Sequence, residues 1–383
     1  MSDSPLLQPI ILNGLTLPNR LVRSATWEGM CDEEGRPTEK LIDTYRSLAL
    51  GQVGLIMSGY AFVTLDGKQL PGKMGIHRDD FAPEMTALTQ AVHAAGGRIC
   101  MQLVHAGGQG SQAAGGRRPL APSAVETAQY SEIPEAMSQE EINRIVAAFG
   151  AGAARAKAFG FDGVQLHGAH GYLINQFLSP HTNQRTDGYG GSAENRRRFL
   201  MEVYQRVREA VGRDYPVMIK LGLSDFLAEG LSEEEALENA KALDQAGIDA
   251  IEVSGGTPAS GKQSPARGRA KTIDQEGYHL TLAHQVKQAV SCQVMVVGGF
   301  RSLELVERAL TGGSADYVSL ARPFIREPDL AKRWSSGDRN PATCQSCNGC
   351  FKPGLKEGGI YCVKEKMLEA RKEAAEASYE TQL

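Results

Sequence analysis

The feature that most constrains the fold of this chain is a unit that recurs along it: a helical stretch, a glycine, and then a short apolar strand. Clear copies have strands at Ile99–Val104, Gly163–Leu166, Ala250–Val253 and Tyr317–Leu320. Weaker strands lie at Leu21–Ser24, Gly54–Ser58, Val217–Leu221 and Val294–Val297. Alternating helices and strands imply parallel pairing through right-handed crossovers. Eight such strands in 383 residues favour a closed (β/α)8 TIM barrel over an open doubly wound sheet, the alternative.

The helices between these strands have recognisable first turns. Ser138 with Glu141, and Ser232 with Glu235, fit capping boxes in which the hydroxyl accepts a free N–H of the first turn. These signals predict helices over Gln139–Phe159, Glu233–Gln245 and, near the end of the repeat, Leu303–Leu310. The strands read as nearly continuous apolar runs, which is expected when both faces of a parallel sheet are covered.

Composition argues against several classes of protein. The net charge is −4, so nothing indicates a nucleic acid or an anionic membrane as partner. The first ten residues lack a basic segment followed by a long apolar run, so no signal peptide is expected. No stretch approaches 18 uninterrupted apolar residues, so no membrane-spanning helix is expected. Seven cysteines in such a chain suggest free thiols or metal ligands, and we expect a cytoplasmic protein.

Two regions depart from the repeat. The barrel is expected to occupy residues 1–335, and residues 336–383 to form a C-terminal extension with a cysteine cluster and a charged tail from Lys364. The stretch Gly107–Glu135 has little periodicity and is rich in Gly, Pro and Ala. In a barrel it is expected to be an excursion beside the active-site face.

Strands 7 and 8 end in residues that suit a phosphate group. Strand 7 runs into Gly298-Gly299-Phe300, after which Ser302 opens a helix, and strand 8 runs into Ala321-Arg322-Pro323. Glycine lets backbone N–H groups approach an anion, a helix N-terminus adds partial positive charge, and arginine binds phosphate in a bidentate manner. The loops after strands 7 and 8 often hold phosphate in barrels. No dinucleotide-binding glycine motif or P-loop is present.

The strand that begins at Gly163 delivers His167, His170 and Tyr172 within six residues. Barrel catalysis occurs at the carboxyl ends of the strands. Two imidazoles can stabilise an enolate-like negative charge, and a nearby phenol is a proton donor at neutral pH. The alternatives are a metal pair, which lacks a third ligand in this segment, and two structural histidines. His105, at the end of strand 3, is either a pocket donor or a structural histidine.

These segments together resemble the old yellow enzyme family, especially its bacterial NADH:flavin oxidoreductase and dienoyl-CoA reductase branches. The resemblance covers about residues 5–335. It includes the runs Leu17–Arg20, Gln102–Gly107, His167–Pro180, Asn183–Ser192 and Glu194–Arg196.

The resemblance implies FMN bound across the barrel mouth. Gln102 would bind the flavin pyrimidine edge, Lys220 would place a cation near N1 and O2, and His167 and His170 would bind the substrate oxygen while Tyr172 donates a proton. The remaining expected flavin contacts are Ala25, Thr26, Tyr60, Gly298, Gly299, Ala321 and Arg322, and the expected substrate pocket includes Trp27 and His105.

This chain departs from the family's pattern at three positions. Many relatives have arginine where this chain has Lys220, which keeps the charge without the bidentate geometry. Trp27 stands where relatives carry cysteine or threonine, so either Thr26 tunes the flavin or Trp27 narrows the pocket. Tyr60 replaces a small residue and either stacks in the pocket or acts as a second donor.

The extension contains four closely spaced cysteines, Cys344, Cys347, Cys350 and Cys362. Four thiolates at these spacings suit a [4Fe–4S] cluster or tetrahedral zinc, with no metal as the third possibility. The dienoyl-CoA reductase branch is similar, although its second gap is one residue longer. In that branch the cluster passes electrons to FMN.

The leading hypothesis is an NAD(P)H-dependent ene-reductase acting on an activated C=C bond of an α,β-unsaturated carbonyl compound or enoyl thioester. The alternatives are a flavin dehydrogenase or demethylase that passes electrons to a partner through the cysteine cluster, and a non-enzymatic redox subunit. The choice between NADH and NADPH, and the substrate, stay open. The resemblance also suggests a homo-oligomer and allows a protein electron donor.

Overall fold

The computed structural model describes residues 4–268 and 272–380, with side chains as far as Ala374. In this part of the chain, parallel strands form a barrel from β3 (Leu21–Arg23), β4 (Leu55–Met57), β6 (Ile99–Val104), β9 (Gly163–Gly168), β10 (Val217–Gly222), β11 (Ala250–Ser254), β12 (Gln293–Val297) and β13 (Tyr317–Leu320). Each strand pairs with the next in chain order, and β13 pairs with β3, which closes the ring. The predicted (β/α)8 barrel and all eight candidate strands are confirmed.

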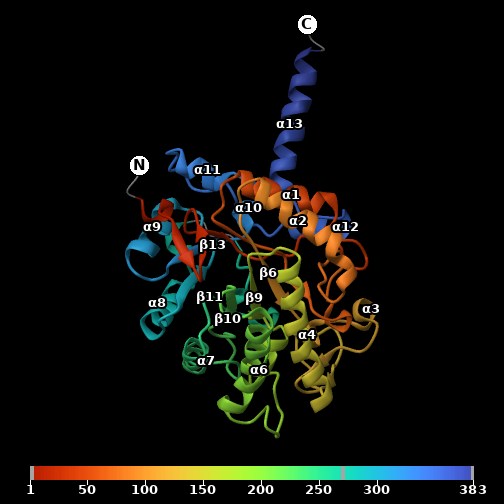
Figure 1. Cartoon of the computed structure of the whole chain (residues 1–383). Coiled ribbons are helices and arrows are strands. Elements are labelled where there is room, and N and C mark those ends of the chain that lie inside the picture. The colour runs from red at the N-terminus through yellow and green to blue at the C-terminus, as the bar shows by residue number, and fades with distance from the viewer. Residues whose placement is uncertain (1–3, 269–271, 381–383) are drawn as a thin grey trace.

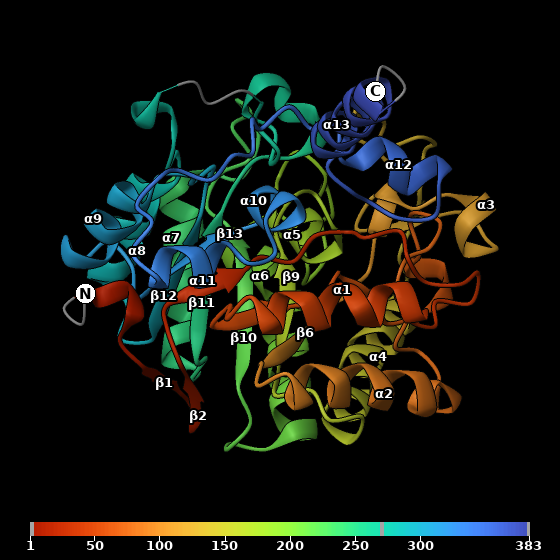
Figure 2. The ribbon, with the colours of Figure 1, turned by 90° about the horizontal axis from the view of Figure 1, so that it is seen from above.

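Helices cover the outside of the barrel (Figures 1 and 2). The longer ones are α1 (Glu39–Leu50), α2 (Ala82–Ala94), α4 (Gln139–Ala158), α6 (Ala193–Val211), α7 (Glu233–Gln245), α8 (Leu280–Ala289) and α9 (Leu303–Thr311). Shorter elements are α3 (Gln112–Gly115), α5 (Leu173–Leu178), α10 (Arg322–Arg326), α11 (Leu330–Ser335), β5 (Ala61–Phe62), β7 (Leu120–Ala121) and β8 (Glu135–Ala136). Most strand residues are buried, as expected for a sheet whose two faces are both covered.

The predicted helix starts are confirmed with one correction. Ser138 and Glu141 form a complete capping box at the start of α4. At α7 the Ser232 hydroxyl accepts from the backbone N–H of Glu235, but the Glu235 side chain pairs with Arg196 instead of returning to Ser232. The second half of that predicted box is therefore wrong, because a neighbouring helix supplies a charged partner for the carboxylate.

The amino-terminal end of the barrel is closed by a hairpin of β1 (Ile10–Leu12) and β2 (Leu15–Leu17). Leu12 and Leu17 of this hairpin join a buried cluster with side chains from the barrel strands, among them Val22, Leu55 and Met218. This end is filled with apolar side chains, so a ligand site is left to the carboxyl ends of the strands.

The C-terminal extension contains α12 (Phe351–Lys356) and α13 (Val363–Glu380). Figure 1 shows α13 extending away from the body of the molecule, and Figure 2 views it nearly along its axis beside α12. The residues of α13 from Lys366 to Ala374 are exposed, whereas Pro353 and Gly354 of α12 are buried. Over the described residues, no helix is both long and apolar enough to cross a membrane.

Candidate active site

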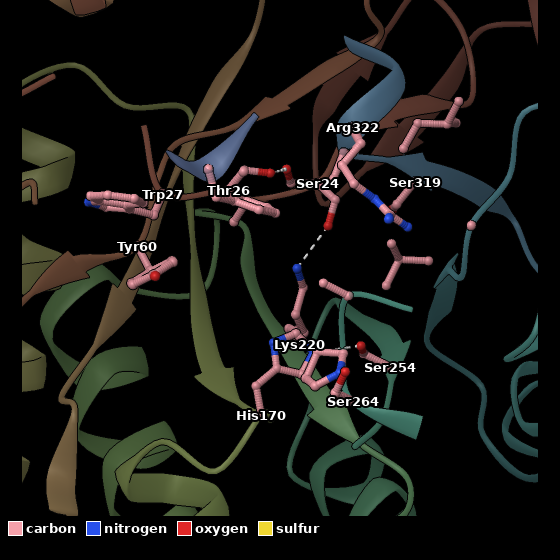
Figure 3. A pocket seen from close by; sticks show the side chains of 18 of the residues that line it. Ser24, Thr26, Trp27, Tyr60, His170, Lys220, Ser254, Ser264, Ser319 and Arg322 are labelled. Carbon is pink, nitrogen blue, oxygen red and sulfur yellow. Dashed lines mark hydrogen bonds between the residues drawn. The ribbon is translucent and has the colours of Figure 1, made fainter. Parts of the chain in front are cut away.

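A cavity of about 490 Å³ lies at the carboxyl ends of the barrel strands (Figure 3). It brings together most of the residues that the sequence nominates: Ala25, Thr26, Trp27, Tyr60, His167, His170, Tyr172, Lys220, Gly299, Ala321 and Arg322. These residues come from six separate segments of the chain, so their convergence is a property of the barrel. Gln102, His105 and Gly298 do not line this cavity.

The two histidines meet where β9 ends. The ring centroids of His167 and His170 are 5.0 Å apart. Nε2 of His170 lies 2.7 Å from Oγ of Ser254 (Figure 3). Burial, the neighbouring His170 and the positive charge of Lys220 hold the pKa of His167 well below its ordinary value. Burial and Lys220 also lower the pKa of His170. Both imidazoles are therefore neutral near pH 7, and each has one N–H to donate.

Tyr172 lies beside the histidines, with its ring centroid 4.7 Å from that of His167. Its hydroxyl donates to Oε1 of Gln69 at 2.8 Å, and Gln69 in turn donates to Oε1 of Gln109. Gln109 donates to the backbone oxygen of His170, so two glutamines tie the phenol to the histidine segment. Burial raises the pKa of Tyr172 to about 12, which keeps the phenol protonated at neutral pH.

Two aromatic residues, Trp27 and Tyr60, contribute to the lining of the cavity. Trp27 donates from Nε1 to the backbone oxygen of Pro71 at 3.1 Å, which fixes the indole ring. The Tyr60 ring lies 5.4 Å from that of Tyr172, and Nζ of Lys73 lies 4.1 Å from the Tyr60 centroid. The bulky side chain of Trp27 thus occupies cavity wall, and Tyr60 packs against Tyr172.

Lys220 supplies a buried amine to the lining of the cavity. Its Nζ donates to Oγ of Ser24 at 2.8 Å (Figure 3). The same atom lies 3.5 Å from Oε2 of Glu252. Burial lowers the pKa of Lys220 from its ordinary value, and the carboxylate of Glu252 opposes that shift. The ion pair with Glu252 thus holds the Lys220 amine in a low-dielectric site, where the amine can donate a hydrogen bond to a bound group.

Two buried polar groups that a chain of hydrogen bonds connects, Gln102 and Lys220, fit the pyrimidine edge of a flavin. Nε2 of Gln102 donates to Gln165, while Oε1 of Gln102 is buried and has no hydrogen-bond partner among the described residues. An unsatisfied buried acceptor costs about 1–3 kcal/mol, which a bound donor would recover. Flavin presents an N3–H donor next to the O2 acceptor, so Gln102 as acceptor and Lys220 as donor are complementary to it.

The other end of the cavity has the features of a phosphate site. Gly299 has φ 74°, and a Cβ atom there would come within 2.7 Å of the Tyr278 ring, so the position requires glycine. Arg322 lines the cavity while its Nη1 donates to the backbone oxygens of Arg267 and Ser346. Oγ of Ser319, another lining residue, is buried without a hydrogen-bond partner in the described part of the chain.

One predicted contribution to phosphate binding is wrong. The backbone N–H groups of Arg301 and Ser302, at the start of α9, both donate to Oε2 of Glu276, at 2.7 and 2.8 Å. The Ser302 hydroxyl donates to the other oxygen of the same carboxylate. The start of α9 is therefore occupied by a side chain of the protein, because Glu276 already satisfies these free donors. Gly298 packs against the backbone of Tyr278 and His279.

His105 is in contact with protein groups on both ring nitrogens. Its Nδ1 accepts from the backbone N–H of Gly107 at 3.0 Å, and its Nε2 lies 3.6 Å from Oδ1 of Asp66. The side chain is fully buried and does not line the cavity. Of the two interpretations that the sequence allows, this geometry favours the structural one.

The four cysteines of the extension line one small cavity of about 20 Å³, and Arg322 lies on its wall as well. Burial raises the pKa of Cys350 to about 11, and burial also raises the pKa of Cys344. In the part of the chain that the structure describes, no group of three or more His, Cys, Asp or Glu side chains has the arrangement of a metal site. The four thiols are nevertheless gathered at one place in the fold.

Sequence reasoning missed several cavity residues. Phe351 and Leu355 of α12 line the cavity, so the extension forms part of the site. His279 and Tyr278 also line it, from the segment before α8. Ser254 is another cavity residue that was missed. The sequence did contain a signal for it, because it directly follows a predicted strand, where barrel sites are built.

Comparisons with known proteins place the chain in a family of flavin enzymes. Residues 5–340 match the model of the NADH:flavin oxidoreductase / NADH oxidase family. An NADH oxidase of Thermoanaerobacter brockii is 37% identical over 89% of this chain and 52% of its own length. An NADPH dehydrogenase of Geobacillus sp. is 36% identical over 85% of this chain and 92% of its own length.

Solved structures agree with this assignment. A 2-naphthoyl-CoA reductase has a TM-score of 0.86 at 30% identity, covering 94% of this chain and 56% of the other. The old yellow enzyme homologue from Zymomonas mobilis has a TM-score of 0.75 at 27% identity, covering 91% of this chain and 98% of the other.

The fold is a TIM barrel with its cavity at the carboxyl ends of the strands, where TIM-barrel enzymes bind their substrates. The chain belongs to the NADH:flavin oxidoreductase / NADH oxidase family. It spans about half the length of some of its curated relatives, such as the NADH oxidase, and nearly the whole length of others, such as the NADPH dehydrogenase.

Proposed function

We propose that this protein is an FMN-dependent ene-reductase that uses NADH or NADPH to reduce an activated C=C bond. The observation that carries the proposal is the placement of Tyr172, a phenol that is protonated at neutral pH, beside His167 and His170 in the cavity that Lys220 also lines. Hydrogen-bond donors for an oxygen and a proton donor for a carbon are thus on one wall.

Residues of this chain would hold FMN along the cavity. Lys220 would donate to the N1/O2 side of the ring system, and Gln102 would accept from N3–H. Gly299 and Arg322 would hold the phosphate. When bound, FMN takes a hydride from the nicotinamide and transfers it to the β-carbon of the substrate.

The protein's own groups supply the rest of the reaction. His167 and His170 each donate one hydrogen bond to the substrate's carbonyl oxygen and stabilise the negative charge that develops there as hydride reaches the β-carbon. Tyr172 delivers its proton to the α-carbon. One hydride and one proton are added across the double bond, and NAD(P)H is oxidised to NAD(P)+.

The cavity wall favours a planar, apolar substrate with one conjugated carbonyl. Trp27, Tyr60 and Phe351 contribute aromatic surface to the lining of the cavity. An α,β-unsaturated ketone and an enoyl thioester both have this chemistry, and solved relatives include a complex of 2-naphthoyl-CoA reductase with 2-naphthoyl-CoA and a morphinone reductase.

For the extension we propose that Cys344, Cys347, Cys350 and Cys362 hold a [4Fe–4S] cluster, with zinc as the alternative. The support is that all four thiols line one small cavity that also borders Arg322. A cluster there would deliver electrons from a partner protein to the flavin site. It would equally allow the reverse flow in a flavin dehydrogenase, the second candidate function.

An anaerobic absorption spectrum before and after addition of NADH tests the proposal. We expect a flavin band that bleaches with NADH and returns on addition of 2-cyclohexenone, with the saturated ketone as product. A broad absorbance beyond the flavin band that also bleaches would support the cluster. Bleaching by an amine and not by NADH or NADPH would favour the dehydrogenase, and failure to take up FMN would overturn the central proposal.

A further inference from the structure

A continuous chain of buried side chains connects Gln102 to Lys220 beneath the cavity. Nε2 of Gln102 donates to Oε1 of Gln165 at 2.7 Å, and Nε2 of Gln165 donates to Oε2 of Glu252 at 2.8 Å. Oε1 of Glu252 accepts from Oγ of Ser24 at 2.7 Å, and Ser24 accepts from Nζ of Lys220 at 2.8 Å. All five side chains are nearly or fully buried. The strand register places Gln102 opposite Gln165 and Lys220 opposite Glu252.

The carboxylate gives this chain a direction. An ionised carboxylate only accepts hydrogen bonds, and the groups around Glu252 are all donors: the Ser24 hydroxyl, the Gln165 amide and the Lys220 ammonium. Gln165 must therefore turn its NH2 group toward Glu252 and its oxygen toward Gln102. Gln102 must then turn its own NH2 group toward Gln165, which leaves its Oε1 as the free acceptor.

The same carboxylate acts on the cation. Glu252 lies 3.5 Å from Lys220, with no exposed surface on the carboxylate side chain, so the attraction between them is only weakly screened. It stabilises the ammonium form of Lys220, and it places a negative charge next to a cation that lines the cavity.

We propose that Glu252 is the positioning residue of the flavin site, which selects an N–H donor at the pyrimidine edge through Gln165 and Gln102 and lowers the flavin's reduction potential by partly neutralising Lys220. The inference rests on the proposed function, since it assumes FMN as the ligand. Glu252 touches neither flavin nor substrate and does not line the cavity. It acts through two amides on one side and an ammonium on the other.

The test compares the full-length wild type with Glu252→Gln, which keeps the shape and removes the charge. An amide at position 252 presents both a donor and an acceptor. It therefore no longer fixes which way the amide groups of Gln165 and Gln102 point. We expect the Kd of FMN to rise about tenfold, which corresponds to about 1.4 kcal/mol. We also expect weaker discrimination against FMN methylated at N3, measured as the ratio of the two Kd values. The flavin midpoint potential should shift to a more positive value, because reduction adds negative charge where a carboxylate has been removed.

Two further variants keep the result interpretable. Gln165→Met removes the hydrogen bonds that connect Gln102 to Glu252 and leaves Glu252 beside Lys220. It should therefore weaken discrimination against N3-methyl FMN without shifting the flavin midpoint potential. Asp225→Asn removes another buried carboxylate of the barrel, one that bonds to Asn175 and the Leu231 N–H, and should change neither quantity.

If Glu252→Gln does not fold, Gln165→Met still tests whether Glu252 orients Gln102 through Gln165. Unchanged discrimination against N3-methyl FMN in Gln165→Met then overturns the proposal. Wild-type values for both Kd ratio and potential in a folded Glu252→Gln protein would also overturn it. A wild type that binds no FMN would instead refute the proposed function.

Discussion

Nη1 of Arg322 lies 2.6 Å from Oδ1 of Asn348 and donates a hydrogen bond to it. Arg322 borders the phosphate end of the cavity, and Asn348 lies between two of the clustered cysteines, Cys347 and Cys350. Asn348 has φ 59°, a left-handed conformation that asparagine adopts more readily than most residues. One guanidinium therefore borders both proposed cofactor sites.

Asn348→Gly tests this connection, because glycine removes the side chain and accepts the backbone conformation. Loss of a charge-assisted hydrogen bond that orients Arg322 should weaken FMN binding by about 1–2 kcal/mol, or roughly five- to thirtyfold in Kd, as measured by quenching of flavin fluorescence. Lys356→Ala, an exposed change in the same extension, is the control and should bind FMN as the wild type does. Equal affinities for Asn348→Gly and wild type would show that the extension does not position Arg322.

Tyr172→Phe separates proton delivery from hydride chemistry. The ring and its packing on His167 are kept, while the hydroxyl that would protonate the α-carbon is lost. We expect single-turnover oxidation of the reduced enzyme by an enone to slow by about 10²-fold or more, and flavin reduction by NADH to change by less than about twofold. Tyr361→Phe removes a hydroxyl whose hydrogen-bond partners among the described residues, Glu357 and Lys366, both belong to the extension, so it should affect neither half-reaction. Equal losses in both half-reactions would contradict the assigned role.

The pH dependence of the oxidative half-reaction follows from the same residue. The active form of Tyr172 is the protonated phenol, and burial raises its pKa to about 12 from an ordinary value of about 10. A raised pKa moves the loss of the acid form to higher pH, so the rate should stay level up to about pH 10.5. Stopped-flow measurements of single turnovers check this. A decline centred near pH 10 would indicate a phenol in ordinary surroundings, or another donor.

The sequence predicts the barrel well because each strand ends in glycine or polar residues and each is preceded by a helix with its own boundary signals. The sequence also predicts His167, His170 and Tyr172 as site residues, because they occupy one short segment at the end of a strand. These features are local, and local patterns specify the secondary structure from which the barrel topology follows.

The features that the sequence did not predict depend on contacts between distant segments. Glu276 takes the N–H groups at the start of α9 from a position 25 and 26 residues earlier, which no helix-start signal reveals. Phe351 and Leu355 belong to a short helix whose docking on the cavity depends on how the extension folds back. Gly354 of this helix lies so close to the Trp27 ring that a Cβ atom would come within 2.9 Å of it. Neither residue alone reveals this contact in the sequence.

The cysteine cluster gives the last prediction. If the four thiols hold a [4Fe–4S] cluster, protein reconstituted anaerobically with iron and sulfide should contain about four iron atoms per chain. Cys344→Ser should lose most of that iron and the broad absorbance, while keeping FMN, because Arg322 retains its bonds to Arg267 and Asn348. Cys292→Ser, which changes a cysteine outside the cluster and in contact with Asp244, is the matched control and should retain the iron. Full iron content in Cys344→Ser would remove that thiol from the ligand set, and reconstituted wild type that binds zinc and no iron would assign the site to zinc.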